Sequence, residues 1–238
     1  PYRGNVMGDK VRTDFDATPY AKLKTANVIG NEAWAAGMRI REQFTGELGA
    51  SGLYFCHGYC ELGAIPVVPT LRIFTDFLAT HPGEVLIIDF EDYVVPADID
   101  SAFVASGLID YVYTGPIEPT WPTLGEMVES GGRVLVLGEY DVGTLPWYHL
   151  AWSGLVAETP YTFHTPEDFS CKANRGTPRG DLFLINHWIE TTPTPKPSNA
   201  QIVNQQDVIV KRARQCRRAR GMTPNILAVD FAGIGDVV

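Results

Sequence analysis

The sequence lacks any long hydrophobic run, although 45% of its 238 residues are hydrophobic and 11% are aromatic. A membrane-spanning helix needs about 20 consecutive apolar residues, so the sequence predicts none. Positive charge is also scarce, because 19 Lys and Arg stand against 28 Asp and Glu and give a net charge of −9. Binding to nucleic acid depends on many cationic contacts with phosphates, so this balance argues against a general nucleic-acid binder. A folded domain with a sizeable core is expected.

Cysteine is nearly absent, with four residues in the whole chain. An even number of cysteines fits an oxidised and therefore exported protein, although the count alone does not fix the pairing. The expected pairs are Cys56 with Cys60 and Cys171 with Cys216, because each first member lies near the end of a predicted strand and Cys216 lies on a late helix. Zinc is the competing use, but the Cys-x3-Cys spacing has no second well-spaced pair of ligands.

One segment departs from the acidic balance. The stretch KRARQCRRAR, residues 211–220, holds six of the 19 basic residues. It closes a predicted helix, where cations offset the negative end of the helix dipole. The same segment could instead bind an anionic membrane or a nucleic acid, and the sequence leaves both readings open.

Apolar segments typical of buried strands alternate with amphipathic segments from residue 52 onward. Strands are expected at 52–55, 84–90, 108–115, 133–141, 181–188 and 225–231, and helices at 69–83, 97–107, 123–132 and 199–221. Such alternation is typical of βαβ units and a parallel sheet. The sequence also lacks a G-x-G-x-x-G turn. The expected fold is therefore α/β, a single TIM-like (β/α)8 barrel domain over residues 1–238 that is irregular or incomplete at its C-terminal helix.

Polar residues lie at the C-terminal ends of most predicted strands, where a barrel of this kind carries its active site. They are His57, Asp89, Glu91, Asp92, Glu139, Asp141, Asn186, His187 and Asp230. Several carboxylates around a histidine suit either a divalent cation bound by oxygen atoms or acid–base chemistry in which a carboxylate orients an imidazole.

The five histidines do not carry equal weight. His57 opens a glycine-containing loop directly after a buried strand, which favours a role in a site. His187 fits a buried core histidine as well as a site residue. His81, His149 and His164 lie at a helix end or among aromatic residues, where capping or packing is expected.

Several segments occur together in the order typical of one family. They are YFCHGYCELGA, FLATHPGEVLIIDFEDYV, TWPTLGEMVESGGRVLVLGE, PWYH, ETPYTF, FLINHW and PNILAVDF. In these segments the chain resembles the phosphatidylinositol-specific phospholipase C X-domain superfamily, in particular its exported bacterial and fungal members. The resemblance implies a TIM-like barrel that cleaves a phosphodiester without an organic cofactor. One histidine of the family acts as general base on a substrate hydroxyl, a second protonates the leaving alcohol, and a cyclic phosphate results.

The resemblance assigns His57, in its CHG context, to the second of these histidines, with the cysteines holding its loop. The first histidine of the family precedes a G-x-R motif, which here is Gly37-Met38-Arg39, by roughly 30 residues. Counting back places Lys10 at the general base and Val11 at the neighbouring asparagine. A lysine serves as a base only if its pKa is strongly lowered.

An arginine or a calcium ion stabilises the phosphate charge in this family. Glu42 and Glu91 match positions of calcium ligands in its calcium-dependent branch, and Asp89 lies on the same strand face as Glu91. Phe44 replaces one expected acidic ligand. Ca²⁺ bound by Glu42, Glu91 and Asp89 is therefore an expectation of the resemblance.

Further roles follow from the same resemblance. Arg39 is expected to pair with a phosphate or a carboxylate, Asp230 to fix an imidazole or a substrate hydroxyl, and Asn186, His187 and Trp147 to bind substrate. The expected reaction is phospholipase C-type cleavage of a phosphoinositide or a related glycerophosphodiester. The alternative is an inactive barrel, lacking the general base, that binds a sugar, a lipid head group or a protein.

The predicted loop over residues 143–176 is rich in aromatic residues. Trp147, Tyr148 and Trp152 are expected to be exposed, where they could rest transiently at a membrane interface, or to close the barrel. The expected partners are a phospholipid or inositol phosphate head group and a membrane surface, with no nucleic acid. The expected location is secreted or in the cell envelope.

Overall fold

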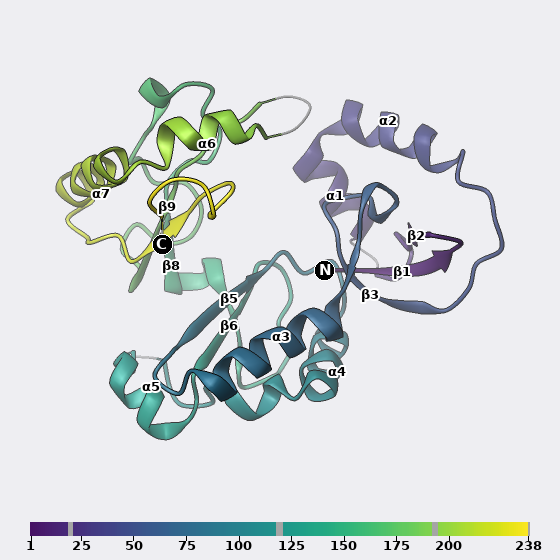
Figure 1. Ribbon diagram of the computed structural model, residues 1–238, viewed down its shortest axis with the longest axis horizontal. Coiled ribbons are helices and arrows are strands. Elements are labelled where there is room, and N and C mark those ends of the chain that lie inside the picture. Colours follow the sequence, from purple (N-terminus) through teal and green to yellow (C-terminus); the bar gives the residue numbers. More distant parts are fainter. Residues whose placement is uncertain (19–20, 118–120, 192–194, 238) are drawn as a thin grey trace. The chain divides into compact units, whose positions relative to one another are not determined.

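The computed structural model describes residues 1–18, 21–117, 121–191 and 195–237. They form two compact units, Pro1–Leu150 and Ala151–Val238, which are labelled by element in Figure 1. Whether the two units make up one domain, as the sequence analysis expects, stays a prediction.

The first unit begins with a four-stranded antiparallel sheet. Its strands are β1 (Tyr2–Met7), β2 (Lys10–Thr13), β3 (Ser51–Phe55) and β4 (Ile65–Pro66), in the order β2-β1-β3-β4. Gly8 and Asp9 connect β1 to β2, and Gly8 has a φ of +61°, a conformation that glycine adopts without steric cost. This two-residue turn makes the first two strands a hairpin.

Two helices, α1 (Ala21–Ile29) and α2 (Asn31–Arg41), connect β2 to β3. They enclose a small aromatic core with the antiparallel sheet. Its buried residues are Tyr2, Phe15, Ala21, Tyr59, Cys60 and Tyr93. Aromatic side chains bury large areas in well-defined orientations, so this cluster fixes the position of α1 against the sheet.

A parallel sheet completes the first unit. It contains β5 (Leu86–Phe90), β6 (Val134–Gly138) and β7 (Tyr148–Leu150) in that order. Two helices, α3 (Val67–Thr80) and α4 (Pro96–Ser106), lie side by side along it (Figure 1), and α5 (Leu124–Ser130) precedes β6. Every residue of β6 is buried, as a strand covered on both faces requires.

The second unit contains a parallel sheet with the order β10-β9-β8. The strands are β8 (Val156–Glu158), β9 (Leu182–Asn186) and β10 (Ile226–Ala228). Two helices, α6 (Pro197–Val203) and α7 (Gln206–Arg220), lie between β9 and β10 in sequence. The disulfide between Cys171 and Cys216 joins α7 to the segment before β9, and the one between Cys56 and Cys60 lies in the first unit. Both predicted pairs are confirmed.

The prediction of an eight-stranded parallel barrel is wrong. Within the described ranges the strands form three separate small sheets, and the first is antiparallel throughout. The hairpin turn at Gly8 explains the difference, because a two-residue connection joins antiparallel strands whereas parallel strands need a longer crossover. The α/β class and the parallel pairing of β5 with β6 and of β9 with β10 agree with the sequence prediction.

Two predicted elements also differ. Residues Leu108–Tyr111 form a short 3-10 helix where a strand was expected. The single helix expected over 199–221 is broken at Asn204, whose side chain Nδ2 donates to the backbone oxygens of Asp230, Phe231 and Ile234. The chain therefore leaves the helix at Asn204 and resumes it at Gln206.

In the part of the chain that the structure describes, no helix is both long and apolar enough to cross a bilayer.

Candidate functional site

A small pocket in the first unit lies where the residues after β3 and β5 come together. It is lined by Tyr2, Thr25, Ile29, His57, Gly58, Glu91 and Tyr93. His57 follows β3, and Glu91 follows β5 directly. Two residues that the sequence predicted for a site, 34 positions apart, are thus brought to one pocket.

The wall of this pocket is built from tyrosines that carry no charge. The rings of Tyr2 and Tyr93 stack with centroids 4.5 Å apart, and the Tyr2 hydroxyl lies 3.0 Å from Thr25 Oγ1. Burial raises the pKa of both phenols, and the nearby Glu91 carboxylate raises them further. The phenols therefore stay protonated, and Glu91 and His57 are the other ionisable side chains of the lining.

Lys24 brings a positive charge to the neighbourhood of this wall. Its Nζ lies 3.9 Å from the ring centroid of Tyr140, and the Tyr140 ring lies 5.4 Å from that of Tyr93. Lys24 precedes Thr25 on α1, so one helix contributes both a pocket side chain and a nearby cation. A cation over an aromatic face is attracted by the negative face of the ring.

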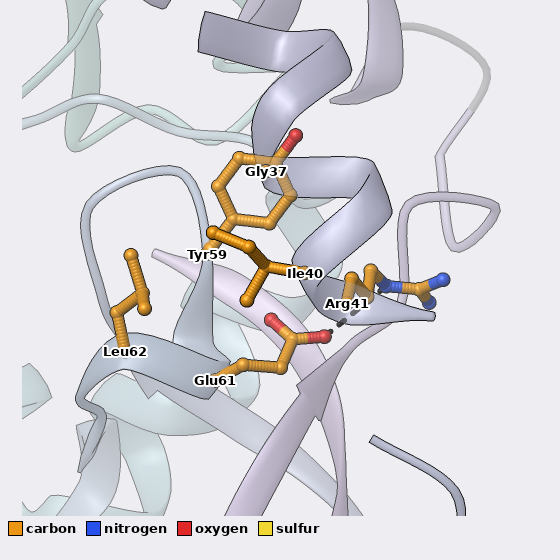
Figure 2. Close-up of a pocket in the computed structure, with 6 residues that line it drawn as sticks. All are labelled: Gly37, Ile40, Arg41, Tyr59, Glu61 and Leu62. Atoms are coloured by element: carbon orange, nitrogen blue, oxygen red, sulfur yellow. Dashed lines mark ion pairs between the residues drawn. The ribbon is translucent and has the colours of Figure 1, made fainter. Parts of the chain in front are cut away.

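The loop that carries His57 is held by the disulfide between Cys56 and Cys60 and by a buried carboxylate next to it. Glu61 is 2% exposed and accepts hydrogen bonds from Thr13, from the backbone nitrogen at 3.0 Å and from Oγ1 at 2.7 Å. Arg41 Nε forms an ion pair with Glu61 Oε1 at 3.1 Å, which is drawn as a dashed line in Figure 2. The end of α2, strand β2 and the His57 loop are therefore joined through one carboxylate.

Tyr59, two residues after His57, locks the same loop against α2. Its hydroxyl donates to the backbone oxygen of Trp34 at 2.7 Å, and its ring lies on Gly37 (Figure 2). A Cβ at position 37 would overlap that ring, so the close approach requires glycine. The glycine of the G-x-R motif thus has a steric function in placing the loop.

Asp92 is a second buried carboxylate near the ends of β5 and β6. Its oxygens accept hydrogen bonds from the backbone nitrogens of Glu139, Tyr140 and Asp141 at 2.9–3.0 Å. Burial raises the pKa of Asp92, and these hydrogen bonds oppose that shift. Asp92 therefore fixes the segment after β6 against the segment after β5, and it places Tyr140 beside the pocket wall.

Comparison with known proteins identifies the family. The family model described as PI-PLC X 1 matches residues 22–238. The chain belongs to the PI-PLC X domain family. The resemblance seen in the sequence is thereby confirmed.

Two relatives come from the fungus Arthroderma benhamiae. The PI-PLC X domain-containing protein 1 is 30% identical over 208 residues, which covers 77% of this chain and 66% of the relative. An uncharacterised secreted protein is 28% identical over 246 residues, which covers 90% of this chain and 55% of the relative. The chain thus spans between about half and two thirds of the curated relatives it matches. No solved structure matches the chain.

The expectation of an exported protein is confirmed by two observations. This PI-PLC X domain forms two disulfides. Disulfides persist in oxidising compartments. One of its relatives is described as secreted.

Other residues predicted for the PI-PLC X site lie away from the His57 pocket lining. Lys10 is exposed at the β1–β2 hairpin, Arg39 and Glu42 are exposed at the end of α2, and Asp89 is exposed on β5. Arg41, rather than Arg39, forms the buried ion pair at this end of α2. Lys10 thus lies in contact with solvent on the hairpin and not in the lining of the His57 pocket.

The resemblance implies a Ca²⁺ site of Glu42, Glu91 and Asp89. Within residues 1–18, 21–117, 121–191 and 195–237, no group of three or more His, Cys, Asp or Glu side chains is arranged to hold a metal ion. The expected Ca²⁺ site of Glu42, Glu91 and Asp89 stays a prediction, and the reaction proposed below uses Glu91 as a base.

The second unit holds the predicted residues Asn186, His187 and Asp230. His187 is fully buried, and its Nε2 donates to the Val203 backbone oxygen at 2.7 Å. Burial lowers the pKa of His187, and the nearby Arg212 lowers it further. Asn186 Nδ2 donates to Glu158 Oε1 and to the Thr159 oxygen at 3.1 and 2.8 Å. Both side chains are thus engaged in the core, and their expected substrate-binding roles stay predictions.

Asp230 follows β10 and is half-buried, and burial raises its pKa. It shares a second small pocket with Trp188, Lys196 and Asn204, among others. Its expected role toward an imidazole or a substrate hydroxyl stays a prediction.

The aromatic residues expected to be exposed behave differently. Trp147 is 5% and Tyr148 2% exposed, and the Trp147 ring packs on Phe103 with centroids 4.9 Å apart. The expected exposure of these two residues is therefore wrong, because they complete the core beneath α4. Trp152 is half-buried and lies 4.1 Å from the guanidinium carbon of Arg175.

Sequence reasoning missed the tyrosines of the pocket lining and also three charged residues around it. Glu61, Arg41 and Lys24 act through partners that are distant in sequence, as with the 48 residues between Thr13 and Glu61.

Proposed function

We propose that this chain cleaves a phosphodiester in the manner of phospholipase C, with a phosphoinositide or a related glycerophosphodiester as substrate. Membership of the PI-PLC X domain family supports this class of reaction. The observation that carries the proposal is the presence of His57 and Glu91 in the lining of one pocket. An imidazole and a carboxylate together supply the two proton transfers that such a cleavage needs.

In the proposed reaction a hydroxyl of the substrate head group attacks the phosphorus. Glu91 takes the proton of that hydroxyl, the bond between phosphorus and the leaving glycerol oxygen breaks, and protonated His57 gives its proton to that oxygen. The products are a cyclic phosphate and a free alcohol, so atoms and protons balance. Glu91 replaces Lys10 as the base, because Lys10 is exposed on the hairpin.

A second candidate function is binding without turnover. The exposed position of Lys10 favours binding without turnover, because neither a histidine nor a buried lysine stands at the position of the family's general base. The chain would then bind a sugar, a lipid head group or a protein through the same family fold.

Release of water-soluble phosphate ester from phosphatidylinositol vesicles distinguishes the two functions. We expect His57→Ala and Glu91→Gln each to lower kcat by about 10²- to 10⁴-fold, the usual contribution of one general acid or base. His81→Ala serves as the matched control, because His81 lies at the exposed end of α3. Each protein is assayed with calcium and with a chelator, and equal rates are expected since the described residues form no metal-binding group.

If the His57→Ala variant cleaves the substrate as fast as the wild type, His57 takes no part in the reaction. No turnover by folded wild-type protein on phosphatidylinositol or glycerophosphoinositol would sink cleavage of these substrates and favour the binding function. Activity lost only in the chelator would restore a metal to the mechanism.

A further inference from the structure

The outward face of α7 carries four exposed cations. They are Lys211, Arg214, Arg217 and Arg218. At about 100° per residue, these positions fall within an arc of roughly 120° on the helix surface. The segment that departed from the acidic balance in the sequence is therefore one continuous basic face, called here the α7 basic face.

The opposite side of α7 is anchored in the second unit, so the basic face has a fixed orientation. Arg212 is 3% exposed, donates through Nη2 to the backbone oxygens of Ser170 and Asn186, and packs with its guanidinium carbon 4.3 Å from the Phe169 ring. Cys216 is fully buried and bonded to Cys171. Rotation of the helix would break these contacts.

Internal contacts do not account for the four charges. The ion pairs found in the described residues join Arg3 to Asp98, Arg41 to Glu61 and Arg175 to Glu158, and none involves α7. Interaction with the helix dipole acts within the last turn, which contains Arg217 and Arg218. Lys211 and Arg214 lie before that turn, so the helix dipole does not account for their charges.

We propose that the α7 basic face docks the protein on the surface of an anionic lipid bilayer. Four cations fixed on one helix face of a chain with a net charge of −9 form a local surface that is complementary to anionic head groups. The choice of a bilayer over nucleic acid rests on the proposed function, whose substrates are lipids or their head groups. The docking would concentrate the protein at the surface that holds its substrate.

Sedimentation with vesicles tests the docking separately from turnover. The vesicles contain phosphatidylcholine alone or phosphatidylcholine with phosphatidylserine, so no inositol lipid is present. The variant is Lys211→Gln with Arg214→Gln, which leaves the last turn of α7 intact. The matched control is Lys10→Gln with Lys22→Gln, which removes two exposed lysines from the first unit.

Wild-type protein is expected to bind the anionic vesicles and not the neutral ones. Each basic residue near an anionic surface is worth about a fivefold change in partition coefficient, so the α7 double variant should bind about 30-fold more weakly. The control variant should bind like the wild type. Added salt should weaken the binding of the wild-type protein steeply, and this measurement tests the electrostatic attraction without a variant.

Three results would overturn the proposal: equal binding to neutral and anionic vesicles, unchanged binding of the α7 double variant, or tighter binding to duplex DNA than to anionic vesicles. Failure of the proposed function looks different, because a protein without turnover would still bind these vesicles through the α7 basic face.

Discussion

At the scale of single residues, Glu61 joins three segments of the first unit while remaining almost completely out of water. Removing its charge breaks the ion pair with Arg41, which keeps its hydrogen bond to the Thr13 backbone oxygen, and weakens two hydrogen bonds from Thr13. We expect Glu61→Gln to lower the free energy of unfolding by about 2–3 kcal/mol, as measured by urea denaturation. Glu129→Gln, at an exposed position of α5, is the control and should change little. Equal stability of the two variants would contradict the role given to Glu61.

His187 makes stability depend on pH. Burial holds its pKa in the folded protein below the ordinary value of 6.5. As the pH falls below 6.5, the unfolded chain therefore takes up a proton that the folded protein resists, and stability falls. We expect His187→Gln to flatten the loss of unfolding free energy between pH 7.5 and pH 5.5.

The measurement is urea unfolding at both pH values, with His164→Gln as the control because His164 is exposed. A wild-type protein that is as stable at pH 5.5 as at pH 7.5 would rule out this effect of His187.

Residue identity predicted some of these features and not others. The pairing of Cys56 with Cys60 depends on a short spacing and is confirmed, and the pairing of Cys171 with Cys216, 45 positions apart, is confirmed as well. The partnership of Glu61 with Thr13 and Arg41 depends on how β2, α2 and the His57 loop meet in space. No local pattern carries that information.

At the scale of elements, the two disulfides constrain very different lengths of chain. Cys171 and Cys216 are 45 positions apart and tie α7 to the second unit, whereas Cys56 and Cys60 are four apart. In the chain-entropy account the longer loop stabilises by about 4 kcal/mol and the shorter one by about 2 kcal/mol. We expect replacement of Cys171 and Cys216 by serine to cost more stability. Replacement of Cys56 and Cys60 by serine should cost more activity.

Urea unfolding and the vesicle assay, run on both double serine variants, check this division. The expectation fails if loss of the pair that flanks His57 leaves turnover unchanged, or if it destabilises the protein more than loss of the other pair.

Most helices and buried strands were predictable because their apolar periodicity is local. The break between α6 and α7 was not, since Asn204 ends α6 by donating to backbone oxygens 26 to 30 residues further along the chain. The short 3-10 helix at Leu108–Tyr111 was misread for a related reason. Its apolar residues suit a strand, but only Val112 finds a strand partner, Val134, within the described residues.

At the scale of the whole molecule, the alternation of strands and helices predicted a closed parallel barrel. The prediction failed at the N-terminus, where β1 and β2 form a hairpin and pair with β3 in an antiparallel sheet. Lys10 and Val11, which the resemblance places at the family's histidine and asparagine, lie on β2 directly after the turn at Gly8. The alternation rule was sound for the later strands, which pair in parallel.

The net charge of the whole chain gives a further test of membrane docking. At pH 7 the charge of −9 repels an anionic bilayer, and it approaches zero near the isoelectric point of about 5.0. We expect binding to vesicles of phosphatidylcholine and phosphatidylserine to increase as the pH falls from 7.5 to 5.5. Sedimentation of the Lys211→Gln, Arg214→Gln variant, which keeps Arg217 and Arg218, shows how much of the pH dependence remains when the α7 basic face is weakened. A wild-type profile independent of pH would contradict the expectation.

The contact between Tyr59 and Gly37 has a consequence for the conditions in which this exported chain can work. The Tyr59 ring is held by its close packing against the Gly37 backbone, and the nearby disulfide between Cys56 and Cys60 is covalent. Neither depends on ionic strength, in contrast to the ion pair of Arg41 with Glu61. The setting of His57 should therefore persist across the changing salinity outside a cell.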